Sequence, residues 1–241
     1  VNSRDLVSLM TDPAKPMFNR ALQAQLAPGS TFKPIVALAA LEEGVADENT
    51  TVHCPGGASY YGRYFRCHKR GGHGTVNLHK AMAQSCDVYF YLLGNRLGID
   101  KIAEYSEAAG FGRKTGVDLP GEKEGLMPSS RWKIRNLREK WYAGETISVA
   151  IGQGYVTSTP LQLAHAIGGL VTGGVWMRPH IVKEAKAVAA ARKMDLRTEN
   201  VVRVINGMCA VVNEGGTGGA SRIPGIEFCG KTGSAQRASI E

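Results

Sequence analysis

The stretch GIEFCGKTGSAQ at residues 225–236 most constrains how this chain can fold, because it satisfies two patterns from different folds. Residues 225–232 match G-x-x-x-x-G-K-[ST], in which a glycine-rich loop binds phosphate and a helix begins at the Lys-Thr pair. Lys231, Thr232 and Gly233 also form a K-T-G tripeptide, which can line one wall of a peptide-binding cleft when it lies on a strand. Only one of these interpretations can hold.

The residues around Lys231 disfavour a nucleotide site. Ile226, Glu227, Phe228 and Cys229 prefer a strand to a phosphate-binding loop, and the glycine after Thr232 is a poor residue for opening a helix. We therefore expect no nucleotide and a strand over 226–236. On such a strand Gly233 would let a substrate backbone approach closely, and Lys231, Thr232 and Ser234 would bind a carboxylate.

Two further motifs precede this stretch. Ser30 and Lys33 stand three positions apart at the predicted start of a helix, so their side chains share one face. A serine hydroxyl needs a base, and a lysine kept neutral by burial can serve. In Ser85-Cys86-Asp87, Ser85 could relay a proton and Asp87 could orient the lysine. Each of these two motifs alone would indicate a helix cap, and the K-T-G alone is weak evidence, but the three in this order indicate acyl transfer by a serine.

Hydrophobic periodicity predicts an α+β fold, with helices in the middle of the chain and strands toward the end. Residues 1–241 are expected to form one domain, with a long Gly- and Cys-rich loop region at 45–76. Residues 1–27 are expected to be loop-rich with one short helical piece, and 110–145 to be mostly loop. Helices are predicted at 28–44, 77–85, 87–97, 100–109, 159–172 and 199–213, and strands at 174–186 and 226–236.

The charge of the chain suggests a polyanionic partner but does not identify one. The net charge is +8, and basic residues cluster at 63–70 and 131–140. No nucleic-acid module accompanies them, so we interpret both clusters as solvated faces and expect no nucleic-acid partner. No apolar run is long enough to cross a membrane; we expect an anchor outside this chain.

Six stretches of the chain together resemble the transpeptidase domain of class B penicillin-binding proteins, most closely the cell-elongation type called penicillin-binding protein 2. The resemblance runs from about Asn19 to Gln236. It implies an antiparallel sheet flanked by helices, as in serine β-lactamases, with an all-helical subdomain, and it implies that some N- and C-terminal strands of the fold lie outside this chain. The stretches are NRALQAQLAPGSTFKP, AMAQSCDVYFYLLG, FGRKTGVDLPGE, ISVAIGQGYVTSTPLQLA, GGVWMRPHIV and GIEFCGKTGSAQ.

The resemblance also implies an activity and a place. Ser30 would attack a D-alanyl-D-alanine stem peptide of peptidoglycan, and an acceptor amine would take the acyl group; β-lactams would block the serine covalently. Backbone N–H groups of Ser30 and Ser234 would form the oxyanion hole. The domain would work on the periplasmic side of the cytoplasmic membrane, with a membrane-embedded glycosyltransferase and elongation-complex proteins as partners.

Two other functions remain open on the sequence. A β-lactamase or β-lactam sensor of the same fold would need a glutamate that activates a deacylating water, for which Glu122, Glu124 and Glu145 are near in sequence. A non-catalytic module that binds peptidoglycan or morphogenesis partners would keep the motifs without covalent labelling.

The cysteines suggest a metal site. Their odd count of five argues against a fully paired disulfide framework, and the long 45–76 region needs something to hold it. The resemblance implies a structural zinc ion bound by Cys54, Cys67, His73 and Cys86, a normal ligand set for zinc. The choice of His73 over neighbouring histidines rests on that resemblance alone. A disulfide such as Cys54–Cys67 and buried free thiols are the alternatives.

Overall fold

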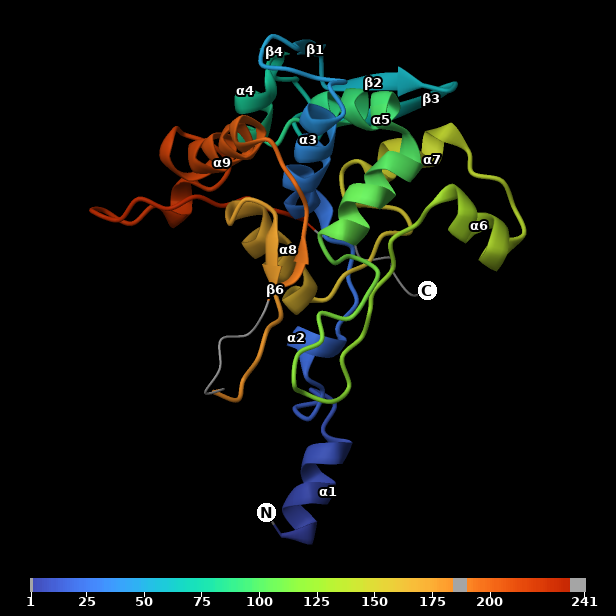
Figure 1. The fold of residues 1–241 in the computed structure, drawn as a ribbon, viewed down its shortest axis with the longest axis vertical. Helices are drawn as coiled ribbons and strands as arrows, with labels where there is room; N and C mark the ends of the chain where they lie inside the picture. Colours follow the sequence, from blue (N-terminus) through green and yellow to red (C-terminus); the bar gives the residue numbers. More distant parts are fainter. Residues whose placement is uncertain (1, 184–189, 235–241) are drawn as a thin grey trace.

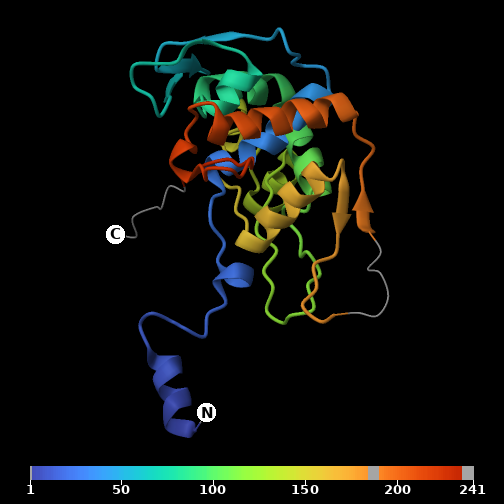
Figure 2. The ribbon, with the colours of Figure 1, turned by 90° about the vertical axis from the view of Figure 1, so that its left-hand side faces the viewer.

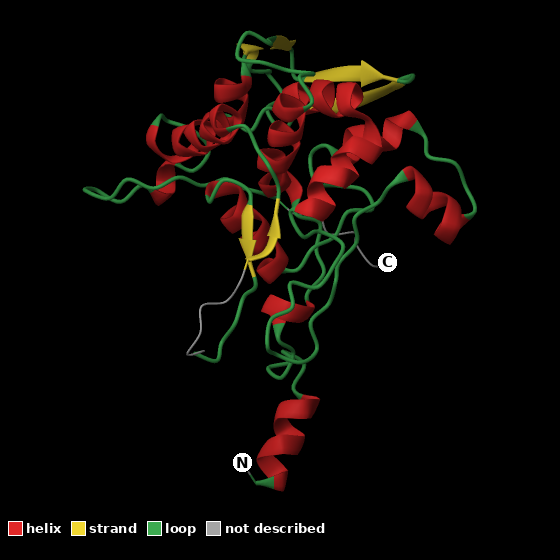
Figure 3. Cartoon of the chain, in the orientation of Figure 1, coloured by secondary structure: helices red, strands yellow, loops and turns green. Residues whose placement is uncertain are grey.

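The structure, a computed structural model, describes residues 2–183 and 190–234. Its regular structure is mainly helical, and the strands of this part of the chain form three separate antiparallel pairs (Figures 1 and 3). The predicted α+β class is confirmed. The longer helices are α1 (Ser3–Thr11), α3 (Lys33–Glu42), α5 (Asp87–Ala108), α6 (Ser130–Leu137), α8 (Pro160–Val171) and α9 (Thr198–Asn213), and the shorter ones are α2 (Arg20–Gln23), α4 (Leu78–Ala83) and α7 (Ala143–Val149).

Helix α3 forms the centre of the core. Every residue from Lys33 to Leu41 is buried, as expected for a helix that is apolar on all sides. A 3-10 turn, η1 (Gly29–Phe32), leads directly into it, and α5, α9, α4 and α8 pack around it (Figure 1). The predicted helix at 28–44 is therefore confirmed, with a tighter first turn that contains Ser30.

Helix α5 carries the S-x-D motif into the core. Asp87 is its first residue, and the helix packs against α3 and α7. Gly98 interrupts its helical geometry with φ 74° and ψ 164°, a conformation that glycine adopts without steric cost. This break falls between the two helices predicted at 87–97 and 100–109, so both are confirmed as halves of one kinked element.

The 45–76 region is a long loop with short strands, as predicted. Strand β1 (Val52–Cys54) pairs with β4 (Gly74–Val76), and β2 (Gly57–Tyr60) pairs with β3 (Arg63–Arg66). Both pairs lie at one end of the molecule beside α5 (Figures 1 and 2). The region thus covers the N-terminal end of α5, where Ser85 and Asp87 lie.

The strand predicted at 226–236 is wrong for the residues that the structure describes. Residues 227–234 are in no strand, and Ile226 makes only an isolated bridge with Ile223; residues 235–236 lie outside the described residues. A strand requires a neighbour for its backbone groups, and here the backbone of Gly230 instead donates to Met208 of α9 at 3.1 Å. The residues have strand propensity, but no ladder forms.

Other predicted boundaries also change. The strand expected at 174–186 is limited to β5 (Val175–Met177), which pairs with β6 (Ala190–Lys193); residues 184–186 lie outside the described residues. Helix α1 lies in the segment expected to be loop-rich and has no buried residue; Figures 1 and 2 show it standing away from the body. Helix α6 and the first three residues of α7 lie in the segment expected to be mostly loop, because these helices are too short to show clear periodicity.

The basic clusters are mostly solvated, as interpreted. All four arginine and lysine residues in 63–70 and most of those in 131–140 are exposed, but Lys133 is buried and bonds to Glu145 at 2.6 Å. In the described part of the chain, no helix has the length and apolar character needed to cross a membrane.

Candidate active site

A cleft of about 300 Å³ lies where the start of α3, the turn between α4 and α5, and the segment 230–234 meet. Three predicted motifs from distant parts of the sequence therefore line one cavity. The lining residues are Ser30, His68, Ser85, Asp87, Ile151, Gln153, Thr217, Thr232, Gly233 and Ser234.

Lys33 lies beneath this cleft and has no exposed surface. Its Nζ donates to Asp87 Oδ1 at 2.6 Å and to the backbone carbonyl of Ser85 at 2.8 Å, and it lies 3.2 Å from Ser85 Oγ. Burial lowers the pKa of Lys33 from its ordinary value, and the charge of Asp87 offsets part of this effect. An amine whose pKa is lowered by burial is suited to accept a proton.

Asp87 joins Lys33 to the 45–76 region. Its second carboxylate oxygen accepts from the backbone N–H of His68 at 2.8 Å and lies 3.4 Å from the His68 ring. Burial alone would raise the pKa of Asp87, but the bonds from His68 and the charge of Lys33 outweigh it and hold that pKa below its usual range. The carboxylate is therefore ionised at neutral pH, and it bonds to the amine that it is expected to orient.

Ser85 lies between two lysines. Lys231 Nζ donates to Ser85 Oγ at 2.8 Å, and Lys33 Nζ lies 3.2 Å from the same oxygen. The backbone of Ser85 has φ 54°, a left-handed conformation that is uncommon outside glycine and often occurs at functional sites. Burial, followed by the charge of Lys33, lowers the pKa of Lys231 to about 7. The Ser85 hydroxyl thus connects two lysines whose pKa values are both low.

Ser30 lines the cleft from the 3-10 turn before α3. The sequence places it on the same face as Lys33; within the described residues, Lys33 donates to Ser85 and Asp87 and not to Ser30. Gly29 before it has φ 57°, and a side chain there would collide with the backbone of Ser234. The backbone segments that carry Ser30 and Ser234, the two residues expected to form an oxyanion hole, are therefore in direct contact.

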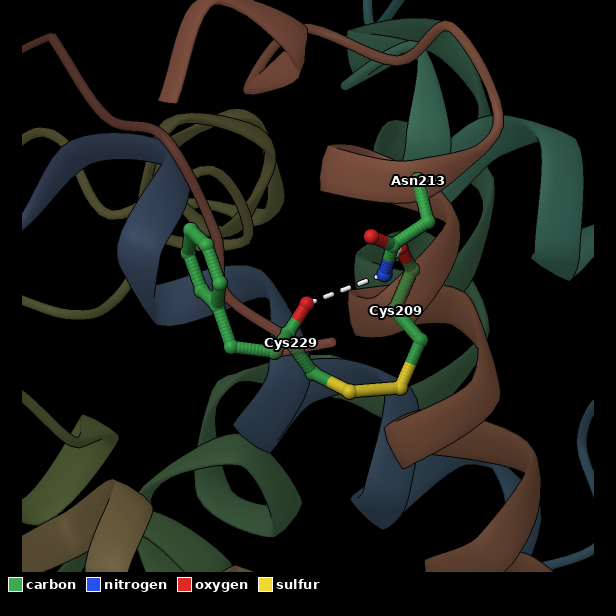
Figure 4. Close-up of a disulfide and its surroundings, with 4 residues drawn as sticks. Cys209, Asn213 and Cys229 are labelled. Carbon is green, nitrogen blue, oxygen red and sulfur yellow. Dashed lines mark hydrogen bonds between the residues drawn. A yellow bond between two sulfur atoms is a disulfide. The ribbon is translucent and has the colours of Figure 1, made fainter. Parts of the chain in front are cut away.

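A disulfide holds the segment that carries Lys231. Cys229 is bonded to Cys209 of α9 (Figure 4), a pairing that the sequence did not predict. Asn213 Nδ2 of the same helix donates to the carbonyl of Phe228 at 2.9 Å. The segment is thus fixed to α9 two residues before Lys231.

Gly233 and Ser234 pack against the start of α3. A Cβ atom on Gly233 would lie 2.7 Å from Thr31 Cγ2, so this glycine is needed for the approach of the two segments. Gln153 Nε2 donates to the carbonyl of Ser234 at 3.2 Å, and the Thr232 and Thr217 hydroxyls are hydrogen-bonded. Residues 231–234 form no helix, which a phosphate-binding loop would require there.

The four predicted metal ligands lie together and are all buried. Their ligand atoms are within 4.8 Å of one another, and the three cysteines are unpaired, so the alternative Cys54–Cys67 disulfide is not formed. His73 Nδ1 lies 3.6 Å from Cys54 Sγ and 3.5 Å from Cys67 Sγ. In a tetrahedral site with Zn–S bonds of about 2.3 Å and Zn–N bonds of about 2.1 Å, sulfur and nitrogen ligands lie about 3.6 Å apart. The hydrogen bond between Cys67 and Cys86 lowers the pKa of Cys67 and raises that of Cys86, so one of the two already favours the thiolate that a metal requires and the other would lose its proton on binding. The residues therefore fit zinc.

The sequence missed four residues that line the cleft: His68, Ile151, Gln153 and Thr217. His68 holds Asp87, and Gln153 holds Ser234. Both act through bonds that depend on loop conformation, which periodicity does not predict. A possible signal was the stretch ISVAIGQGYVTSTPLQLA, in which Gln153 lies between two glycines with positive φ.

Comparisons with known proteins agree with this geometry. Residues 2–240 match the model of the penicillin-binding protein transpeptidase domain. The chain is 42% identical over its full length to the peptidoglycan D,D-transpeptidase MrdA of Acinetobacter baumannii, of which it covers 37%. It resembles the structure of Pseudomonas aeruginosa PBP2 in complex with WCK 5153 (TM-score 0.91, 38% identity, 98% of this chain and 54% of that one). It also resembles Helicobacter pylori PBP2 in complex with MreC (TM-score 0.88, 35% identity, 98% and 45%).

These relatives show the extent of the match. The chain spans well under half of the curated MrdA proteins it matches, from 29% to 39% of their length. The similarity nevertheless covers almost all of this chain, and it includes every motif that lines the cleft. The chain therefore belongs to the family of penicillin-binding protein transpeptidase domains.

Proposed function

We propose that this domain is a peptidoglycan D,D-transpeptidase that works through an acyl-Ser30 intermediate. One observation carries the proposal: Ser30 lines a cleft together with Ser85, Asp87 and residues 232–234, and both Ser85 and Asp87 bond to the buried Lys33. A nucleophile, a base with lowered pKa and a second cation for a carboxylate are the groups that serine acyl transfer needs.

In the proposed reaction the stem peptide lies in the cleft with its terminal carboxylate near Lys231, Thr232 and Ser234. Lys33 accepts the Ser30 proton, and Ser30 Oγ bonds to the penultimate D-alanine carbonyl carbon. The C–N bond to the terminal D-alanine then breaks, and the amine leaves with a proton delivered through the Ser85 hydroxyl. An acceptor amine from a second stem peptide attacks the ester, forms the cross-link and returns the proton to Ser30.

The β-lactamase alternative needs a glutamate at the cleft. Glu122 is buried and accepts from Thr115 and Gly116, and Glu145 pairs with Lys133. Neither these two nor Glu124 is among the described residues that line the Ser30 cleft. Glu122 and Glu145 are held in structural bonds and Glu124 is exposed outside the cleft lining, which supports a long-lived acyl-enzyme.

The experiment is kinetic labelling with a fluorescent penicillin. We expect a stoichiometric, slowly lost adduct, no adduct with Ser30→Ala, a nearly complete loss with Lys33→Ala, and normal labelling with the exposed control Ser221→Ala. Rapid turnover of the penicillin would favour the β-lactamase, and the absence of labelling in the folded wild type would favour the non-catalytic binding module.

We propose a structural zinc ion bound by Cys54, Cys67, His73 and Cys86. The burial and spacing of the four ligand atoms support it. When bound, zinc would supply four bonds that tie β1 and the loop after β3 to the Ser85–Asp87 turn, since Cys86 lies between those two cleft residues. The chain's own His68–Asp87 bond then aligns Lys33 from the same side.

Elemental analysis of protein purified without added metal tests this zinc proposal. We expect about one zinc per chain and a lower melting temperature for Cys86→Ser and after chelation. Cys209→Ser/Cys229→Ser, which removes the disulfide cysteines, should keep its zinc. Less than about a tenth of an equivalent of zinc in the folded wild type would reject the site.

We propose that the domain acts on the periplasmic side of the cytoplasmic membrane with partners of the elongation machinery. The support is similarity: one structural relative is Helicobacter pylori PBP2 bound to MreC, and another is part of a peptidoglycan synthase complex. Coupling to a membrane-embedded glycosyltransferase would supply glycan strands to the cleft. Co-purification of the full-length protein with such partners from membranes would test this assignment.

A further inference from the structure

A second cavity, of about 480 Å³, lies between the β2–β3 hairpin and α7 and is separate from the Ser30 cleft. Its volume is in the range of small-ligand sites, and no motif of the sequence analysis accounts for it. We call it the tyrosine groove. The lining residues are Tyr60, Tyr61, Arg63, Phe65, Tyr142, Ala143, Gly144, Glu145, Ser148, Val149, Gly154 and Tyr155.

The tyrosine groove presents aromatic rings with polar edges. Tyr61, Tyr142 and Tyr155 are 63%, 52% and 38% exposed, which is unusual for three large rings in one concavity. The charge of Glu145 is already paired with Lys133, so Glu145 adds little net charge to the tyrosine groove. Flat apolar faces bordered by hydroxyl groups suit a ligand that is itself flat, with C–H faces and hydroxyl edges. Sugar rings have this character.

Two of the rings are held in place before any ligand arrives. Tyr61 has φ 51°, which is strained for a bulky residue at a hairpin turn where Asn or Gly is usual. Its hydroxyl donates to Asn95 at 2.6 Å. Tyr155 packs between Trp132 and Trp141, with ring centroids 5.3 and 6.3 Å apart. A strained tyrosine fixed by a hydrogen bond points to a binding role.

The groove adjoins the catalytic cleft through one short loop. Ile151 and Gln153 line the Ser30 cleft, whereas Gly154 and Tyr155 line the tyrosine groove. A stem peptide in the cleft would therefore have this groove beside it. The peptidoglycan stem peptide is carried on a polymer of sugar rings, so the polymer must pass close to the cleft.

We propose that the tyrosine groove binds the glycan strand to which a stem peptide is attached. This inference rests on the proposed function, because it assigns the sugar part of the same substrate. Tyr61, Tyr142 and Tyr155 would stack on pyranose faces, and Arg63, held over the Phe65 ring at 5.3 Å, would bind ring substituents. Binding there would orient the peptide for entry beside Ser30 and raise its local concentration.

The test uses calorimetry on the complete chain with glycan strands from which amidase has removed the stem peptides. The groove variant combines Tyr61→Asn, which tolerates positive φ, with Tyr142→Ala. The control is Tyr64→Ala, an exposed tyrosine of the same hairpin that does not line the groove. We expect the groove variant to weaken glycan binding by about ten-fold or more, as for aromatic hot spots, and the control to bind as the wild type does. Tryptophan fluorescence should change on glycan binding, since Trp132 and Trp141 flank Tyr155.

Penicillin acylation separates failure of this proposal from failure of the proposed function. The groove variant should acylate at the wild-type rate, because penicillin has no glycan. Three results would overturn the groove assignment alone. They are a wild type that acylates but binds no glycan, a groove variant that binds glycan as tightly as the wild type, and a Tyr64→Ala variant that loses as much glycan affinity as the groove variant. Saturable binding of an apolar helical peptide in place of glycan would overturn it as well, in favour of a protein partner. A chain that does not acylate would remove the proposed function itself.

Discussion

At the scale of single residues, Lys33 is the group whose surroundings matter most. It is buried completely and bonds to the Asp87 carboxylate at 2.6 Å. Removing one partner of such a pair leaves an uncompensated buried charge. Asp87→Asn keeps the shape of the side chain and removes its charge, so the effect of Asp87 on the charge of Lys33 is open to direct measurement.

Asp87→Asn should move the acid limb of the acylation rate to lower pH. Burial lowers the pKa of Lys33, and Asp87 raises it. Without the carboxylate, the ammonium form of Lys33 is no longer stabilised by a negative charge. The pKa of Lys33 therefore falls further, and the neutral amine persists to lower pH. Penicillin acylation rates measured from about pH 5 to pH 9 would show the shift, and the exposed control Asp195→Asn should leave the profile in place. An acid limb that stays fixed in Asp87→Asn would mean that Lys33 is not the titrating base.

Lys231 should make stability depend on pH. Its pKa in the folded protein is about 7, against an ordinary value of 10.5. Between these values the unfolded chain binds a proton that the folded chain does not, so the stability of the folded state rises with pH across this window. Lys231→Met removes the group. The melting temperature of Lys231→Met relative to wild type should therefore be highest at and below pH 7 and should decline as the pH approaches 10.5. The exposed control Lys114→Met should show no such trend, and a pH-independent difference for Lys231→Met would refute the lowered pKa.

The residues of the site were more predictable than their contacts. Ser30, Lys33, Ser85, Asp87 and Lys231 follow from the order of three motifs, because each needs only a residue type at a fixed spacing. The roles of His68 and Gln153 do not follow, since each depends on a loop that brings its polar atom to Asp87 or Ser234. No local pattern in the sequence encodes such an approach.

At the scale of elements, the segment 227–234 is held by contacts other than a ladder. Its backbone and side chains are fixed to α9 by the Cys209–Cys229 disulfide, by Asn213 and by Gly230 (Figure 4). The residues have strand propensity, but a strand also needs a neighbouring strand to pair with. No neighbouring strand pairs with 227–234 in the described part of the chain. Helix α8, in contrast, follows from sequence alone: Thr159 and Gln162 form a capping box with Pro160 between them.

Removing the disulfide should therefore loosen the site as well as the fold. Cys209→Ser/Cys229→Ser opens a covalent loop with a separation of 20 residues, which is worth about 3 kcal/mol of stability in the chain-entropy model. We expect denaturant unfolding to show that loss, and penicillin acylation to slow because Lys231 is less well placed. A phosphine reductant should slow the wild type and leave the double variant unaffected. An acylation rate that the double variant keeps at the wild-type value would show that the tether has no part in placing Lys231.

At the scale of the whole molecule, three regions far apart in sequence meet at one point. The 45–76 region reaches the cleft through His68, α3 through Lys33, and the C-terminal segment through Lys231. The apolar helix at the centre and the α+β class could be predicted from periodicity. The division of the strands into three separate pairs could not, because pairing depends on which segments are neighbours in space.

Peptide mapping by mass spectrometry after incubation with penicillin tests the central claim most directly. The account predicts one added penicillin mass per chain, carried by the peptide that contains Ser30, and no addition in Ser30→Ala. It also predicts that this acyl-enzyme persists for much longer than a β-lactamase takes to hydrolyse its own acyl-enzyme. An adduct mapped to Ser85 or Ser234 in the wild type, or a Ser30→Ala variant that is modified as fast as the wild type, would contradict the assignment of Ser30 as the nucleophile.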